Sequence, residues 1–278
     1  MSPNNILPRI ILLALLMLSF NSVADSGSLQ TTINGEHRSK AHQNRDQSRH
    51  PGETLAFFGV EPDMTVVEIW PGGKGWYTEI LAPYLKDRGL LYVAQFDENS
   101  TVPYFSKSFA KFKQKLAAHP DIYGQVIITT LQPPKQLEIA PPGSADRVLT
   151  FRNVHNWMKS DQALQAFEAM YLALKPGGIL GVVEHRNAAQ AEQDPKAKSG
   201  YVTETTVIHL AEQIGFKLLA KAEINANPKD THEHPKGVWS LPPTFRGGEK
   251  NKASFEQIGE SDRMTLKFIT KVSGFKKS

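Results

Sequence analysis

Apolar and polar stretches alternate along most of the chain and predict strands separated by helices. Apolar runs that predict strands cover residues 64–70, 90–96, 125–130, 147–151, 179–183, 216–224 and 264–270. Apolar residues at helical spacing predict helices over residues 52–60, 76–85, 105–118, 161–174 and 203–214, with Ser160 as the cap of the fourth. Near-continuous apolar strands that alternate with helices are typical of a sheet covered on both faces. The pattern therefore predicts an α/β fold with a seven-stranded, mostly parallel sheet and helices on both faces.

The first 24 residues have the composition of a cleavable export signal. Arg9 precedes an apolar run over residues 10–20, and small residues then lead to Ala24, after which we expect cleavage. The run is shorter than the roughly 20 residues that a membrane-spanning helix needs. We therefore expect no stable membrane anchor after cleavage, and a periplasmic or secreted protein.

The remaining chain divides into a leader and one domain. Residues 25–50 are polar and of mixed charge, so we expect a leader or strap rather than a core element. Residues 51–278 are long enough for one α/β domain. Residues 225–261 are expected to form a long loop, and such loops are usually functional lids or mobile segments.

Charge and cysteine content exclude several kinds of site. The formal net charge is only +4, and we expect no nucleic-acid partner because the basic residues form no continuous stripe. We expect solvated faces for these basic residues, which are Arg38, Lys40, Arg45, Arg49, Lys267, Lys271, Lys276 and Lys277. The absence of cysteine excludes disulfides, thiolate metal sites and a cysteine nucleophile.

A glycine-rich loop follows the first predicted strand. Gly72, Gly73 and Gly75 join the strand that contains Glu68 to a helix, and glycines at such a turn allow a ligand to approach the backbone. Asp97 ends the second predicted strand, where a carboxylate can accept hydrogen bonds from both hydroxyls of a ribose. The combination predicts a nucleotide-type cofactor site.

Three motifs resemble class I S-adenosylmethionine (SAM)-dependent methyltransferases. They are the segment from Glu68 to Thr78, the segment Arg152-Asn153-Val154-His155-Asn156-Trp157, and the turn Lys175-Pro176-Gly177-Gly178. Within that superfamily the chain is most similar to exported predicted methyltransferases of bacteria. These share an Arg-Asp-x-x-Arg leader, a Pro-x-x-x-Leu-x-Phe-Phe-Gly-Val helix and an acidic residue followed by His-Arg, found here at Arg45 to Arg49, Pro51 to Val60 and Glu184 to Arg186.

The resemblance implies a Rossmann-like fold and a bound SAM. The cofactor contacts that it implies are Glu68, Trp70, Gly72, Gly73, Gly75, Asp97 and Asn153. Two departures occur, because Trp70 and Lys74 stand where the superfamily usually has glycine. No carboxylate closely follows the third predicted strand, so the adenine would be held by backbone or by the 129–131 region.

Two histidines are the candidate catalytic residues. Methyl transfer to a hydroxyl acceptor needs a base near the methyl group, and His185 and His155 follow strands whose ends face that site in the inferred fold. We rank His185 first, because Glu184 and Arg186 flank it. His232 and His234 have a spacing that suits a metal, but without a distant third ligand we expect a solvated loop and no metal site.

Three functions remain open at this point. The first is a SAM-dependent methyltransferase whose acceptor, a small molecule or a protein, is unknown. The second is a non-catalytic protein that binds a nucleoside or another small ligand on a Rossmann-like fold. The third is an NAD-type oxidoreductase, which the Lys175 to Gly178 turn and the Arg152 to His155 segment disfavour.

Overall fold

The computed structural model describes residues 26–272 of the chain. The predicted signal peptide of residues 1–24 lies outside these residues. Within them, no helix is both long and apolar enough to cross a membrane. The first described element is the helix α1 (Ser26–Ile33).

Seven strands form one sheet in the order β3-β2-β1-β4-β5-β7-β6. They are β1 (Thr65–Ile69), β2 (Leu90–Gln95), β3 (Ile127–Thr130), β4 (Ala145–Phe151), β5 (Leu174–His185), β6 (Lys217–Ala222) and β7 (Arg263–Ile269). The first five strands pair in parallel, whereas β7 runs antiparallel between β5 and β6. The predicted seven-stranded, mostly parallel sheet is confirmed. Its order differs from the 3-2-1-4-5-6 order of dinucleotide-binding folds.

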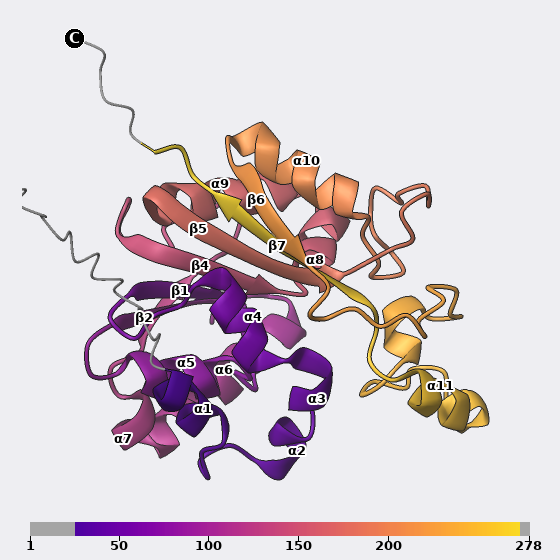
Figure 1. The fold of residues 1–278 in the computed structure, drawn as a ribbon, viewed down its shortest axis with the longest axis horizontal. Helices are drawn as coiled ribbons and strands as arrows, with labels where there is room; N and C mark the ends of the chain where they lie inside the picture. Colours follow the sequence, from indigo (N-terminus) through magenta and orange to yellow (C-terminus); the bar gives the residue numbers. More distant parts are fainter. Residues whose placement is uncertain (1–25, 273–278) are drawn as a thin grey trace, which may run out of the picture.

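Helices cover both faces of this sheet (Figure 1). One layer contains α1, α4 (Pro51–Phe58), α5 (Thr78–Leu85), α6 (Pro103–Ala118) and α7 (Pro120–Tyr123). The other layer contains α8 (Val154–Lys159), α9 (Ala163–Ala173) and α10 (Glu204–Ile214). The leader adds α2 (Lys40–Gln43) and α3 (Asp46–Arg49), and the long loop contains two 3-10 helices, Gly237–Ser240 and Glu249–Asn251, and α11 (Lys252–Ile258).

The two helical layers enclose two separate apolar clusters. Successive strand residues point to opposite faces, so Val66 joins one cluster and Val67 the other. Phe58 of α4 packs so closely on β5 that a Cβ at Gly181 would lie 2.7 Å from its ring. Each fully buried large apolar side chain contributes about 1.5–3 kcal/mol, so these clusters provide most of the stability of the fold.

The region around Ser160 differs from its prediction. The helix expected over residues 161–174 begins at Ala163, and Ser160 instead follows α8, a helix that the sequence pattern did not predict. With six residues, α8 is too short to display a periodicity. The expected turn at residues 175–178 lies within β5, because Leu174 already pairs with Ala145 before the strand register shifts.

The leader lies against α5 and the glycine loop. Leu29 and Ile33 are buried in the same cluster as α5. Arg38 and Arg49 of the leader, which were expected to be solvated, are instead buried. Arg38 forms two hydrogen bonds of 2.8 Å to the carboxylate of Asp46, and Arg49 packs over the ring of Trp76. Arg38 is held by a partner within the leader and Arg49 by one from the glycine loop, and the local sequence pattern shows neither contact.

Candidate functional site

The loop after β1 is open at one glycine only. Its backbone has positive φ at Trp70, Gly72 and Gly75. A Cβ at Gly72 would have no other atom within 4 Å, whereas at Gly75 it would lie 2.8 Å from the ring of Phe112 and at Gly73 3.2 Å from the carbonyl oxygen of Ser108. Gly72 therefore leaves space for a ligand, while Gly73 and Gly75 allow α6 to pack against the loop.

Glu68 is buried beneath the loop. Its carboxyl group accepts a hydrogen bond of 2.6 Å from the hydroxyl of Thr78. Burial raises the pKa of Glu68 to about 8, although the hydrogen bond from Thr78 opposes this shift. The group is therefore largely protonated at neutral pH, and its observed partner is a residue of α5.

Trp70 fills the space between the carboxyl ends of the first strands. Its ring lies 4.8 Å from that of Phe96, 5.7 Å from that of Phe105 and 5.5 Å from that of Trp157. The indole N–H donates a hydrogen bond of 2.9 Å to the carbonyl oxygen of Leu131. Because these neighbours follow β2, β3 and β4, the ring occupies the edge of the sheet where a parallel α/β fold usually binds its ligand.

Asp97 does not line the cavity next to the glycine loop. Its carboxylate accepts a hydrogen bond of 2.9 Å from the backbone N–H of Asn99, which closes a local turn. The side chain that contacts the loop is Gln95, whose amide donates a hydrogen bond of 3.1 Å to the carbonyl oxygen of Gly72. The role predicted for Asp97, holding a ribose beside this loop, therefore has no support from its position.

Asn153 follows β4 and forms hydrogen bonds to the ends of β1 and β4. Its side-chain amide donates hydrogen bonds to the carbonyl oxygen of Ile69 at 2.9 Å and to the hydroxyl of Thr150 at 3.2 Å. The residue is buried. Its contacts stabilise the start of the glycine loop, and it reaches the predicted site only through Ile69.

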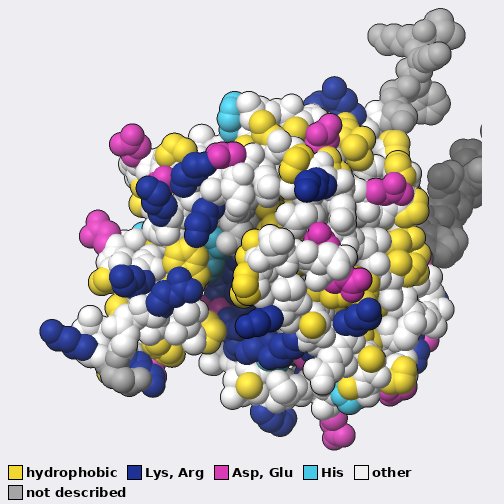
Figure 2. Space-filling view, turned by 180° about the vertical axis from the view of Figure 1, so that it is seen from behind, with side chains coloured by type: hydrophobic (Ala, Val, Ile, Leu, Met, Phe, Trp, Pro, Cys, Tyr) yellow, Lys and Arg dark blue, Asp and Glu magenta, His cyan; other side chains and the backbone are white. Residues whose placement is uncertain are grey.

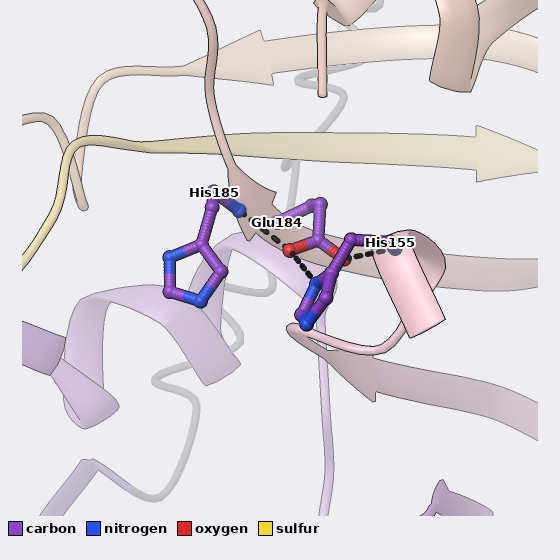
Figure 3. Close-up of side chains that lie close together, drawn as sticks. All are labelled: His155, Glu184 and His185. Atoms are coloured by element: carbon purple, nitrogen blue, oxygen red, sulfur yellow. Dashed lines mark hydrogen bonds and ion pairs between the residues drawn. The ribbon is translucent and has the colours of Figure 1, made fainter. Parts of the chain in front are cut away.

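The two candidate catalytic histidines lie together on either side of Glu184 (Figure 3). The fully buried carboxylate of Glu184 accepts hydrogen bonds from the backbone N–H of His185 at 2.7 Å and of His155 at 3.2 Å. Nδ1 of the His155 ring lies 3.0 Å from the same carboxylate. Because a carboxylate only accepts hydrogen bonds, Nδ1 of His155 is the donor in this contact, and Nε2 is the ring nitrogen that Glu184 does not contact.

His185 has a different environment, although its ring centre is only 5.4 Å from that of His155. Its Nδ1 lies 2.5 Å from the hydroxyl oxygen of Ser261, in the segment before β7. Burial, followed by the charges of His155 and Arg152, lowers the pKa of His185 well below its usual value. The ring therefore stays neutral at physiological pH and is a weak base.

His155, Glu184 and His185 also offer three potential metal ligands. One ligand atom from each lies within 4.8 Å of the others, in the pattern of two histidines and one carboxylate that binds transition metals. The positive charges that lower the pKa of His185 also oppose a metal cation. The sequence-based expectation of no metal site stays a prediction.

The pair His232 and His234 was expected to be solvated, and this expectation is wrong in its detail. Nε2 of His234 lies 2.8 Å from a carboxylate oxygen of Asp230, which is buried and also accepts hydrogen bonds from the hydroxyl of Tyr201. His232 lies 3.5 Å from Asp262. These contacts fix the long loop to the segment before β7.

A cavity of about 680 Å³ lies between the glycine loop, α6, the leader and the long loop. Pro71, Gly72 and Gly73 form one wall, and Pro243 and Thr244 of the long loop line the opposite side. Lys and Arg side chains gather around this hollow in the space-filling view (Figure 2). The cationic side chains among its lining residues are Arg45, Arg49, Lys74, Lys107, Lys111 and Arg152.

The sequence patterns did not indicate that these cations line one cavity. Arg45 and Arg49 belong to the leader motif and Arg152 to the motif after β4, so their positions in motifs were the available signal. Arg152 also has positive φ, which is uncommon for a residue other than glycine. The patterns did not reveal that these segments meet at one cavity.

Comparison with solved structures shows which fold this is. A SAM-dependent methyltransferase from Aquifex aeolicus is 15% identical to this chain, covers 72% of it and 93% of its own length, and has a TM-score of 0.52. A SAM-dependent methyltransferase from Methanosarcina mazei is 11% identical, with coverages of 79% and 97% and a TM-score of 0.50. The [4+2]-cyclase SpnF is 13% identical, with coverages of 89% and 93% and a TM-score of 0.57.

The chain therefore has the Rossmann-like fold of class I methyltransferases. No protein-family model matches it, and no curated protein is similar to it in sequence. At identities of 11% to 15%, the likeness to solved structures concerns the fold alone.

Proposed function

We propose that this chain is a SAM-dependent methyltransferase that acts in the cavity beside the glycine loop. The observation that carries the proposal is the open position at Gly72, on a fold that SAM-dependent methyltransferases share. A loop that leads from a strand into a helix and lacks a side chain at its exposed point allows close contact between ligand and backbone.

The residues fit the cofactor on one side of Trp70 only. Pro71, Gly72 and Gly73 would hold it, because they line the cavity and Gly72 leaves room above the backbone. Asp97 does not line this cavity, and the ring of Trp70 packs on the neighbouring Phe96, so we assign no ribose contact to Asp97. When bound, SAM would supply a methyl group bonded to a sulfonium sulfur, and the neutral thioether that departs, S-adenosylhomocysteine, needs no proton.

This proposal assigns His155 as the base, although His155 is buried and, like Asp97, is not among the residues that line the cavity. Glu184 orients its ring through Nδ1, and the lone pair on Nε2 can accept a proton from a hydroxyl acceptor. Carboxylate and imidazole have the same relation in the triads of hydrolases, where the carboxylate fixes the tautomer. His185 ranks second, because its surroundings lower its pKa.

Calorimetry with SAM and S-adenosylhomocysteine tests the proposal. We expect wild type to bind both and Asp97→Asn to bind them with unchanged affinity, since Asp97 does not line the cavity. Loss of binding in Asp97→Asn would place the cofactor in the position that Trp70 fills. Absence of binding of either compound at millimolar concentration would refute the methyltransferase function.

A second candidate is a protein that binds a different small ligand on the same fold. Two observations favour it. Trp70 closes the edge of the sheet beside Asp97, and the cavity lining is cationic, whereas SAM carries a net positive charge. The cyclase SpnF has a similar fold under a name that describes no methyl transfer. Binding of an anion by a protein that binds neither SAM nor S-adenosylhomocysteine would favour this candidate.

A further inference from the structure

We propose that the cavity binds a small anionic molecule carrying phosphate or carboxylate groups, with Arg152, Lys107 and Lys111 among its contacts. The inference deepens the proposed function by making this anion the methyl acceptor. Only that part of the inference rests on the proposed function. Binding of the anion itself is argued from the charges around the cavity.

The cavity lining is far more basic than the chain as a whole. The chain has 32 Lys and Arg residues against 28 Asp and Glu residues, so the two signs are nearly balanced. Among the described residues that line the cavity there are six cationic side chains and no carboxylate. A concave surface lined by one sign of charge concentrates ligands of the opposite sign.

Next to the cavity, the carboxylate of one residue, Glu260, interacts with three guanidinium groups. Glu260 lies 2.6 Å from Nε of Arg45, 2.6 Å from Nη2 of Arg263 and 3.7 Å from Nε of Arg49. Burial alone would raise the pKa of Glu260, but the charges of Arg263 and Arg49 outweigh it and lower the pKa to about 2. Glu260 is thus ionised and still leaves this cluster with an excess of positive charge.

Arg152 adds a fourth guanidinium and has no partner of its own within residues 26–272. Its side chain makes no hydrogen bond or ion pair there, although it lines the cavity. Burial, followed by the charge of Arg263, lowers the pKa of Arg152 to about 10, so it remains protonated at neutral pH. By accessible surface the side chain is only partly buried, so an anion in the cavity would reach it and supply the hydrogen-bond acceptor that the described residues do not.

Arg49 provides an independent indication of a missing ligand group. Its side chain is buried, and Nε has no hydrogen-bond partner among the described residues. Burial and the charge of Arg152 lower the pKa of Arg49. Nε itself is closed to solvent, but Arg49 lines the cavity, and an anion there would offset the excess positive charge around it.

Helix α6 contributes a further part of the cavity lining. Lys107 and Lys111 are one turn apart on the same helix face, and Pro103 and Tyr104 at the helix N-terminus line the same cavity. The N-terminus of a 16-residue helix favours negative charge. A cavity of about 680 Å³ is in the size range of small-molecule sites, so we infer a small molecule rather than a nucleic acid.

The test is calorimetry at low salt with pyrophosphate, inorganic phosphate and citrate as probes, in the absence of SAM. We expect pyrophosphate or citrate to bind wild type and the affinity to fall as potassium chloride is added. Arg152→Gln should weaken binding about tenfold or more, as should the pair Lys107→Gln with Lys111→Gln, since each removes charged hydrogen-bond donors. If pyrophosphate binds more tightly than citrate, phosphate is the preferred group. The reverse order identifies carboxylate.

Lys113→Gln is the matched control. Lys113 lies on the same helix, is exposed, and pairs with Glu98 outside the cavity. It should leave pyrophosphate binding unchanged, and an equal loss in this variant would mean that anions bind the surface of α6 nonspecifically. No binding of any probe to wild type, or tighter binding of a single-stranded oligonucleotide than of pyrophosphate, would overturn the proposal.

A second measurement separates an anion-binding role of Arg152 from a purely structural one. Without ligand, Arg152→Gln should raise Tm in low-salt buffer because it relieves repulsion from Arg263 and Arg49. It should also abolish the rise in Tm that pyrophosphate gives wild type. A lower Tm would show that Arg152 stabilises the fold and would contradict the inference. Failure of SAM to bind would leave these results unaffected, so the two proposals fail separately.

Discussion

The carboxyl edge of the sheet has two halves of opposite chemistry. Over β1, β2 and β3, the ring of Trp70 packs on Phe96 and Phe105, and the polar side chains of Glu68 and Gln95 are buried nearby at the strand ends. Over β4 and β5, the side chains of His155, Glu184 and His185 meet (Figure 3). One half is closed by aromatic packing, and the other is an arrangement of hydrogen-bonded ionisable groups.

This difference shows why the fold alone does not determine the ligand. A parallel α/β sheet places its binding groups at the carboxyl edge, but the side chains decide which part of that edge is accessible. Here the ring of Trp70 fills the part beside Phe96 and Leu131, and Gly72 leaves the loop open at the basic cavity. The following predictions test each half of the edge.

Removing the aromatic closure should have the largest effect. Trp70→Ala deletes a buried ring with three aromatic neighbours, and such deletions in a packed core cost about 3–5 kcal/mol. The free energy of unfolding from denaturant titration measures the loss. A loss below about 1 kcal/mol would mean that the ring is not essential to the core and is free to yield its place to a ligand.

Blocking the open glycine should abolish SAM binding while the fold is retained. Gly72→Val puts a branched side chain into space that the ligand needs, as measured by calorimetry and circular dichroism. Gly143→Val is the matched control, since Gly143 also has positive φ and open space but lies before β4, away from the cavity. Both variants should lose about 1–2 kcal/mol of stability through backbone strain, and only Gly72→Val should lose binding.

Retained binding in Gly72→Val would place the cofactor elsewhere. Equal loss of binding in both variants would attribute the effect to strain rather than to contact with the ligand. Either outcome would remove the observation on which the proposed function depends.

Removing the base should lower the rate without affecting the cofactor. His155→Ala is expected to reduce turnover on a hydroxyl acceptor about 100-fold, the scale of general base catalysis, with SAM affinity unchanged. His185→Ala should have a smaller effect, because burial and nearby charges keep the pKa of His185 low. His209→Ala, at an exposed position of α10, is the control.

The order of these two effects decides which histidine is the base. A larger loss in His185→Ala would restore the ranking that the sequence favours. A rate unchanged in both variants would indicate an acceptor that needs positioning only, such as an amine that is already deprotonated.

The buried acid of the closed half should affect stability through pH. The folded pKa of Glu68 is about 8, above that of the unfolded chain, so the folded state holds the proton between about pH 4.5 and 8. The protonated carboxyl therefore contributes its full stability to the fold below the pKa of the unfolded chain. This stability is lost as the pH rises through the folded pKa of about 8. Glu68→Gln should remove this loss and gain on the order of 1–3 kcal/mol over wild type near pH 8.

Denaturant titrations at pH 5, 7 and 8 measure this difference. An equal difference between wild type and Glu68→Gln at all three values would show that Glu68 has an ordinary pKa. A steeper loss in the variant would mean that the ionised carboxylate is stabilised in the folded protein, as a direct ligand contact would require.

The fold could be predicted because each strand corresponds to a short continuous pattern in the sequence. Buried parallel strands appear as continuous apolar runs, and the glycine loop and the two histidines follow these runs directly. Strand ends that are neighbours in the sheet bring His155 and His185 together, as the inferred fold required. Element boundaries and the single-turn helix α8 were less accurate, since they depend on pairing and packing.

The composition of the site could be predicted only in part, because its partners are distant in sequence. Arg45 and Arg49 come from the leader and Arg263 from β7, and no local pattern indicates that they share a single carboxylate, Glu260. The closure by Trp70 is also a tertiary effect. Its sequence position showed a departure from the usual glycine, but only the contact with Leu131 shows where the ring lies.

The smallest expected effect concerns metal ions at the histidine cluster. Binding through Nδ1 of His155 would require loss of its proton and of its hydrogen bond to Glu184, and a cation would face Arg152, Arg263 and Arg49. We therefore expect zinc, cobalt or nickel to leave Tm unchanged, and a chelator to leave it unchanged as well. A saturable rise in Tm that disappears in both Glu184→Gln and His185→Ala would instead identify a metal site. Such a site would also change the comparison between the two halves of the edge, because the polar half would then hold a metal cation next to arginines. The anion in the cavity would be needed to balance the charges of the metal and of the arginines.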